Sequence, residues 1–202
     1  MYATVEARWF LAGPIPEAVS AWFRALPGQS EPEPTRVDHY LSGSGDGVGI
    51  KLRHGRLEIK QRYRQRGIVH FHDRAGASVS HWRKWSFPLA PRAVDVAPGS
   101  YWIAVEKTRR IHRYGVVEEG RIIPAAERDW GWCEVELSTV RVAGRVWWSL
   151  CFETAQADAA LESILQPVAR YVFAEGIPCD LLPADSSAYP RWLEKRVEKE
   201  EG

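Results

Sequence analysis

One pattern constrains the fold of this chain more than any other: charged and apolar residues alternate along many short segments. Successive residues of a β-strand point to opposite faces of a sheet, so this alternation predicts strands with one charged face and one apolar face. Turn-forming residues separate the segments. We expect eight strands, at residues 6–10, 38–41, 48–53, 57–64, 80–87, 101–114, 132–142 and 146–153.

Turn and helix signals complete the outline of the chain. His54-Gly55 and Ala143-Gly144 predict tight hairpin turns between consecutive strands. Residues 14–26, 157–174 and 190–200 have the apolar spacing of helices, so we expect three helices there. Many short antiparallel strands favour a sandwich or a barrel, and the order of elements is that of an α+β fold dominated by one antiparallel sheet.

The composition is that of a globular protein with almost no net charge. Apolar residues make up 45% and charged residues 26% of the 202 residues. Lys and Arg number 27 against 26 Asp and Glu, and this balance argues against a binder of long nucleic acid. No apolar run approaches the ~18 residues of a membrane span, and the N-terminus lacks the pattern of a signal peptide. We therefore expect a soluble, cytoplasmic, single-domain protein.

The charged residues of the expected strands segregate by sign. Basic residues dominate residues 50–66 and 107–113, whereas Glu134 and Glu136 share one face of a later strand. A sheet with one solvated face is one interpretation. The other is a closed barrel with a charged interior, which needs a ligand because buried like charges repel and their desolvation is costly. Arg and Lys match phosphate oxygens and paired carboxylates bind Mg²⁺, so a metal-bound polyphosphate would suit that interior.

The order of these charged strands resembles that of the CYTH family of triphosphate tunnel metalloenzymes. The family has an N-terminal E-x-E-x-K strand, a D-x-Y strand, basic strands of the L-R-x-R, T-x-K and K-x-R types, and a late E-x-E strand. The corresponding segments here are Thr4-Val-Glu6-Ala-Arg8, Asp38-His-Tyr40, Lys51-Leu-Arg53, Glu58-Ile-Lys60-Gln-Arg62, Lys107-Thr-Arg109 and Glu134-Val-Glu136. The resemblance runs in order through residues 4–155.

The resemblance implies one CYTH-like domain over residues 1–202, with an eight-stranded antiparallel tunnel barrel over about residues 4–155 and helices over about residues 157–200. It implies metal-dependent hydrolysis of tripolyphosphate or of a nucleoside or thiamine triphosphate, so the partner would be a small phosphorylated anion. Glu6, Glu134 and Glu136 would hold Mg²⁺ or Mn²⁺ and carry the catalysis. The phosphate-binding residues would be Arg8, Lys51, Arg53, Lys60, Arg62, Lys107 and Arg109.

Two residues depart from the family pattern. Thr4 stands where the first Glu of the N-terminal signature is expected, and Arg8 stands in place of its final Lys. The first change removes a carboxylate from the metal set, and the second keeps the charge but removes a proton acceptor. The alternative function is therefore a non-catalytic CYTH-like module that binds a phosphorylated or other organic anion. A third hypothesis is an interaction protein whose charged face is solvated.

Two further motifs favour structural roles over binding. The glycine-rich segment 43–49 lacks the G-x-G-x-x-G order of a nucleotide-binding loop, and we expect it to connect a hairpin. His70 and His72 could share a strand face with His81 nearby, which would suit zinc, but core or surface positions are favoured.

The ten Trp residues and three Cys residues are expected mainly in the core. Trp130, Trp132 and the pair Trp147-Trp148 are the candidates for an aromatic contact with a ligand at a barrel rim. The Cys residues are widely spaced and form no C-x-x-C pair, so we expect free, buried thiols.

Overall fold

The computed structural model describes residues 1–90, 101–125, 132–155, 160–174 and 176–197. The strands are β1 (Tyr2–Ala12), β2 (Glu31–Pro32), β3 (Arg36–Leu41), β4 (Val48–Arg53), β5 (Arg56–His72), β6 (Ala75–Pro88), β7 (Trp102–Val116), β8 (Ile122–Pro124), β9 (Trp132–Val142) and β10 (Arg145–Ala155). The helices are α1 (Glu17–Ala25), α2 (Gln166–Phe173) and α3 (Tyr189–Val197), together with the short helical segments η1 (Glu118–Gly120), η2 (Leu161–Leu165) and η3 (Pro183–Asp185).

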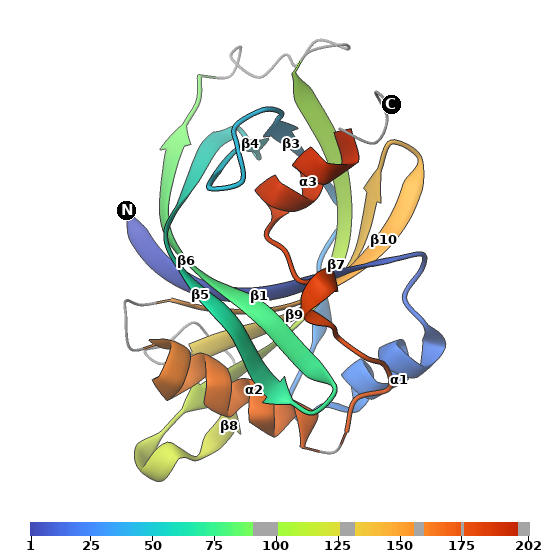
Figure 1. Cartoon of the computed structure of the whole chain (residues 1–202), viewed down its shortest axis with the longest axis vertical. Helices are drawn as coiled ribbons and strands as arrows, with labels where there is room; N and C mark the ends of the chain where they lie inside the picture. Colours follow the sequence, from blue (N-terminus) through green and yellow to red (C-terminus); the bar gives the residue numbers. More distant parts are fainter. Residues whose placement is uncertain (91–100, 126–131, 156–159, 175, 198–202) are drawn as a thin grey trace.

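Eight strands close into an antiparallel barrel (Figure 1). Their order around the barrel is β7-β3-β4-β5-β6-β1-β10-β9, and β9 pairs in turn with β7. The short strands β2 and β8 also pair with β7. The barrel interpretation is therefore confirmed, because closure turns one face of every strand toward a common interior.

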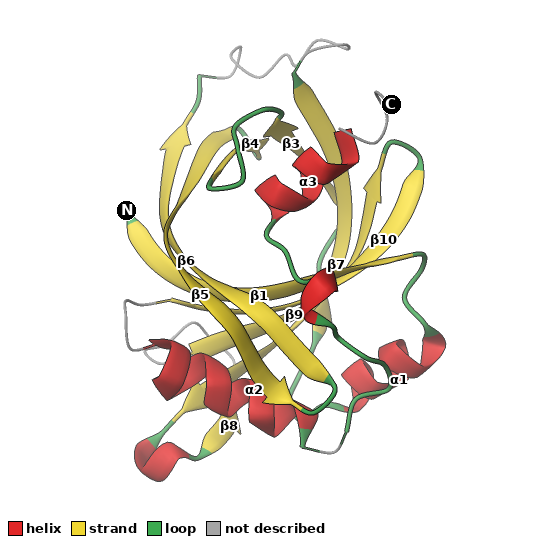
Figure 2. Ribbon diagram, in the orientation of Figure 1, coloured by secondary structure: helices red, strands yellow, loops and turns green. Residues whose placement is uncertain are grey.

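The apolar face of the sheet is covered from outside by helices (Figure 2). Val5, Ala7 and Trp9 of β1 are fully buried in a cluster that also contains Phe23 of α1 and Val168 of α2. The indole N–H of Trp9 donates to the carbonyl of Gly76, at 2.8 Å. Because helices cover the outer face and the barrel encloses the inner one, β1 is buried on both faces along most of its length.

A second apolar cluster lies inside the barrel and involves α3 (Figure 1). The ring of Trp192 stacks on Phe10 with centroids 4.3 Å apart, and Tyr189 stacks on Tyr40 at 5.2 Å. Gly49 of β4 permits this approach, since a Cβ there would lie only 2.9 Å from Cγ of Pro190. The C-terminal helix therefore closes one end of the barrel interior.

The observed elements extend or match those that the sequence predicts. Each expected strand coincides with an observed strand to within a residue or lies inside a longer one, and β5 and β6 are much longer than expected. His54 and Ala143 take the positive φ that their tight turns require. The expected helix over residues 157–174 is a π-helical turn followed by α2, and Pro167 sits in the first turn of α2, where proline is tolerated. Residues 157–159 and 198–200 of the expected helices lie outside the described residues.

Candidate functional site: a charged tunnel

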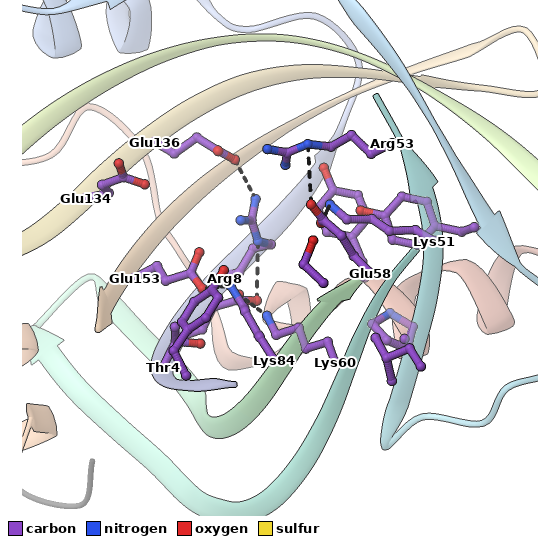
Figure 3. A pocket seen from close by; sticks show the side chains of 18 of the residues that line it. Thr4, Arg8, Lys51, Arg53, Glu58, Lys60, Lys84, Glu134, Glu136 and Glu153 are labelled. Atoms are coloured by element: carbon purple, nitrogen blue, oxygen red, sulfur yellow. Dashed lines mark hydrogen bonds and ion pairs between the residues drawn. The ribbon is translucent and has the colours of Figure 1, made fainter. Parts of the chain in front are cut away.

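The middle of the barrel holds a cavity of about 410 Å³, a size that suits a small ligand (Figure 3). Tyr189 and Tyr40 line it at the end closed by α3, and Tyr2 and Trp132 line it near the ends of their strands. Eight basic and five acidic side chains line the cavity, which leaves an excess of three positive charges. They are Arg8, Arg36, Lys51, Arg53, Lys60, Lys84, Lys107 and Arg109, and Glu6, Glu58, Glu134, Glu136 and Glu153.

One side of the cavity, which we call the basic wall, is formed by cations from β3, β4 and β7. Its members are Arg36, Lys51, Arg53, Lys107 and Arg109. Three of them surround a single carboxylate, that of the fully buried Asp38: Arg36 Nε lies 3.3 Å, Lys51 Nζ 3.3 Å and Lys107 Nζ 3.2 Å from its oxygens. Burial raises the pKa of Asp38, but Lys51 and Lys107 outweigh it, so the carboxyl stays ionised. Glu58 also binds Lys51 and Arg53, and Glu33 binds Arg36 and Arg109, so three carboxylates face the five cations of this wall.

Lys107 occupies the most enclosed position of the basic wall. Its ammonium group donates to the hydroxyl of Tyr40 at 2.7 Å and lies 3.6 Å from the ring centroid of Tyr189. Burial lowers the pKa of Lys107 well below its ordinary value, although Asp38 opposes that shift. This lysine therefore gives up its proton more readily than an exposed one.

The opposite side, which we call the acidic wall, carries carboxylates from β1, β9 and β10 (Figure 3). Its members are Glu6, Glu134, Glu136 and Glu153. The strand register pairs Glu6 with Glu153 and Glu153 with Glu134, so these three residues form one row across three adjacent strands. Each has a cation that it does not share with the other two: Lys60 for Glu6, Lys84 for Glu153, and Arg113 for Glu134 at 3.1 Å; Arg8 Nε also lies 3.5 Å from Glu6.

Glu136 lies one step further along β9 and joins the two walls. It accepts from Arg8 Nη1 at 2.9 Å and from Arg109 Nη1 at 2.8 Å. Cys151 of β10 stands between Arg8 and Glu136 in the register, and its small side chain lets the guanidinium reach across. Burial raises the pKa of Glu136, but Arg8 and Arg109 outweigh it and hold the pKa well below its ordinary value.

The structure brings almost all of the sequence-predicted site residues to this cavity. Glu6, Glu134 and Glu136 line it, as do Arg8, Lys51, Arg53, Lys60, Lys107 and Arg109. Arg62 is not among the lining residues: its guanidinium donates to Asp46 at 2.8 Å, in the loop between β3 and β4. Thr4 lines the cavity, and its buried hydroxyl has no hydrogen-bond partner in the described part of the chain.

Sequence reasoning did not identify several residues of the tunnel as site residues. Glu153 ends the apolar run of β10, which reads as a buried strand with one terminal charge, so nothing local marks it. Lys84 lies among aromatic residues of β6, and only its register with Tyr2 places it on the inner face. Arg36, Asp38 and Glu58 were likewise not assigned to the site, although alternation along their strands could have placed them beside Lys51 and Lys60.

The remaining motifs have structural positions. Among the described residues no three His, Cys, Asp or Glu side chains are grouped as a metal site, so the histidines of β5 and β6 form none. The segment 43–49 connects β3 to β4, which pair as a hairpin. Cys133 and Cys151 are free and buried, as expected, whereas Cys179 is free but only half-buried.

The tryptophans divide between the core and the barrel rim. Trp9, Trp82, Trp148 and Trp192 are buried. Trp132 lines the cavity, Trp147 packs against Trp192 with ring centroids 5.7 Å apart, and Trp130 lies outside the described residues.

None of the helices described is long and apolar enough to cross a membrane.

Comparison with solved structures finds a likeness in fold. The chain matches HpAC1 from Hippeastrum, a candidate adenylyl cyclase with a dominant triphosphatase activity, over 98% of this chain and 96% of that one. The TM-score is 0.47 and the sequence identity 13%. No protein-family profile and no curated protein matches the sequence. The strand pairing and the enclosed cavity form the tunnel barrel that the CYTH resemblance implies.

The CYTH resemblance implies a divalent cation held by the carboxylates of the acidic wall. Mg²⁺ and Mn²⁺ favour several anionic oxygens around one point. Here the carboxylates of Glu6, Glu153 and Glu134 are each bound to a separate cation, and Glu136 is held by two arginines. The donor chemistry suits a hard metal, but the charges around it are already compensated. As arranged, the residues do not fit a divalent cation.

Proposed function

We propose that the barrel binds a small, highly charged phosphorylated anion, of the triphosphate type, in its tunnel. One observation carries the proposal: in the described part of the chain, the five cations of the basic wall share three carboxylates, those of Glu33, Asp38 and Glu58, beside an enclosed cavity. Clustered cations of this kind are costly to bury without a counter-charge. A phosphate chain supplies that charge, and its oxygens match both the forked Arg donors and the Lys ammonium groups.

The position of α3 at one end of the tunnel sets the direction in which an anion would lie. Charged side chains occupy the interior beyond Tyr189, and α3 closes that end, so a ligand would extend along the barrel axis from this closed end. Arg8 and Arg109 bind Glu136, whereas Lys51 and Arg53 of β4 share Glu58 and are the more exposed cations, so they would face the ligand. This geometry supports binding by charge and position, which is the alternative that the sequence left beside hydrolysis.

Binding and turnover can be measured in one experiment. Thermal stability is followed with tripolyphosphate, ATP and thiamine triphosphate, each with EDTA or with Mg²⁺ or Mn²⁺, and released phosphate is assayed in the same wells. A ligand of the native state raises stability by ~2.7 kcal/mol at a hundredfold excess over its dissociation constant. Stabilisation in EDTA without release supports the proposal.

Two other outcomes separate the competing hypotheses. Phosphate release that depends on the metal would show the triphosphatase that the CYTH resemblance implies. No stabilisation by any of the three anions, with sulfate and citrate as comparison anions, would contradict a phosphate tunnel. The assay therefore decides between binding, hydrolysis and an unrelated role.

A further inference from the structure

We infer that Lys60 and Lys84 serve as built-in replacements for a divalent cation in the carboxylate row, so the tunnel binds its anion without a metal. The row is Glu6, Glu153 and Glu134, on β1, β10 and β9. The inference rests on the proposed function for the identity of the anion. The replacement itself rests on the side-chain pairing in the acidic wall.

The strand register places the three carboxylates of the row on adjacent strands. Directly paired residues of adjacent antiparallel strands have Cβ atoms about 4.5–5.5 Å apart, near enough for neighbouring carboxylates to share one cation. Both Glu6 and Glu134 are almost completely buried, with 4% and 6% of their surface exposed. Carboxylates so close together and so buried require positive charge between or beside them.

Lysines supply that charge from the neighbouring strands. Lys60 of β5 donates to Glu6, and Lys84 of β6 donates to Glu153. The second pair crosses β1, because Lys84 and Glu153 lie on the two strands that flank β1. A metal placed among these carboxylates would meet two ammonium groups at close range, and the repulsion would oppose its binding.

Thr4 explains why the second pair can form. Lys84 is opposite Tyr2 in the register, and Glu153 is opposite Glu6, so the ion pair spans the level of Thr4, the inward residue between them. A Glu at this position would add a fourth carboxylate beside the row and compete for Lys84. Thr4, which replaces the Glu of the family pattern, therefore leaves Lys84 available to bind Glu153.

The test measures binding of Mn²⁺ alone by electron paramagnetic resonance, and binding of tripolyphosphate by calorimetry in EDTA or in Mn²⁺. We expect the unmodified chain not to bind Mn²⁺ in the tunnel and to bind tripolyphosphate in EDTA. The variant Lys60→Met/Lys84→Met removes the lysine partners of Glu6 and Glu153 and leaves Glu6 with Arg8 alone, so its Mn²⁺ affinity should rise by about tenfold or more. Its affinity for tripolyphosphate should fall in EDTA and recover with Mn²⁺.

A matched control loses two positive charges outside the tunnel. Arg141→Met/Arg145→Met changes two exposed residues of the β9–β10 hairpin and should gain no Mn²⁺ affinity. If the lysine variant does not fold, Thr4→Glu/Lys84→Met tests the same row and should also gain Mn²⁺ affinity.

The results distinguish this inference from the proposed function. Mn²⁺ binding by the unmodified chain that Glu153→Gln weakens would overturn the lysine replacement, whatever the anion result. Absence of Mn²⁺ gain in a folded lysine variant would overturn it as well. Failure of tripolyphosphate to bind the unmodified chain would overturn the proposed function, while the Mn²⁺ comparison would still decide the role of the lysines.

Discussion

The two walls of the tunnel contain the same kinds of charged side chain but differ in how these charges are paired. On the acidic wall, four carboxylates face four cations, and each of Glu6, Glu134 and Glu153 has its own partner. On the basic wall, five cations share three carboxylates: Asp38 binds Arg36, Lys51 and Lys107, Glu58 binds Lys51 and Arg53, and Glu33 binds Arg36 and Arg109. The acidic wall is neutral within itself, and the basic wall is not. The difference teaches that unbalanced charge, rather than the number of charged residues, distinguishes the wall to which the proposed anion would bind.

The largest expected effect concerns the stability of the acidic wall. Arg8→Met should lower the free energy of unfolding by about 3–5 kcal/mol, because it leaves Glu136 and Glu6 buried with one cation fewer each. Urea unfolding measures the loss. Arg24→Met breaks the exposed pair with Glu17 and should cost about 0–1 kcal/mol. A loss for Arg8→Met as small as that of the control would show that the wall does not depend on internal pairing.

The next effect concerns ligand binding at the basic wall. Lys51→Met/Arg53→Met removes two tunnel cations, and each charge-assisted contact is worth about 1.5–3 kcal/mol, so tripolyphosphate affinity should fall by about a hundredfold or more. Calorimetry measures the change. The charge-matched Arg141→Met/Arg145→Met variant should bind like the unmodified chain. Equal losses in both variants would mean that the anion responds to overall charge and not to this wall.

A smaller effect is the pH dependence of stability that comes from Glu136, where the two walls meet. The pKa of Glu136 lies well below its ordinary value of 4.5, so its stabilising contribution is present above pH 4.5 and is lost as the pH falls through the folded-state pKa. Stability should therefore decline below about pH 4.5, and Glu136→Gln should reduce the slope by up to about 1.4 kcal/mol per pH unit. Unfolding measured from pH 3 to pH 7, in both proteins, would show it. An unchanged slope would mean that Glu136 is not ionised by its arginines.

The smallest effect concerns Lys107 and the pH dependence of binding. Because burial lowers the pKa of Lys107, it loses its charge at a lower pH than an ordinary lysine, and anion affinity should fall by a few-fold as the pH rises toward the ordinary lysine pKa of 10.5. Lys107→Arg keeps its charge over this range and should remove most of the decline. A decline of the same size in the arginine variant would assign the pH dependence to another group.

Much of the barrel could be predicted from local sequence. The alternation in residues 48–53 and 132–142 matches β4 and β9, and the turns at His54-Gly55 and Ala143-Gly144 close their hairpins. Strand period and turn conformation depend on near neighbours, so a sequence records them directly. The same alternation identified Glu6, Arg8, Lys51 and other residues that now line one cavity.

Pairing across distant strands could not be predicted in this way. Lys60 and Glu6 are 54 residues apart, and Lys84 and Glu153 are 69 apart, yet they form ion pairs because β6, β1 and β10 are neighbours in the barrel. Arg62 shows the converse, since it shares a strand face with Lys60 but turns to Asp46 in a nearby loop. Strand register and loop position depend on the closed sheet as a whole, so they cannot be predicted from the residues of one strand at a time.

By itself, the sequence determined that this chain forms charged, alternating strands with both signs present and separated along the chain. Only the tertiary structure decided which face is enclosed, because α1 and α2 cover the apolar face and closure of β9 on β7 encloses the other. Closure also decided that these carboxylates form ion pairs with lysines and an arginine of distant strands. Local periodicity fixes the direction in which a side chain points, whereas its electrostatic partner depends on the strands that the fold places beside it.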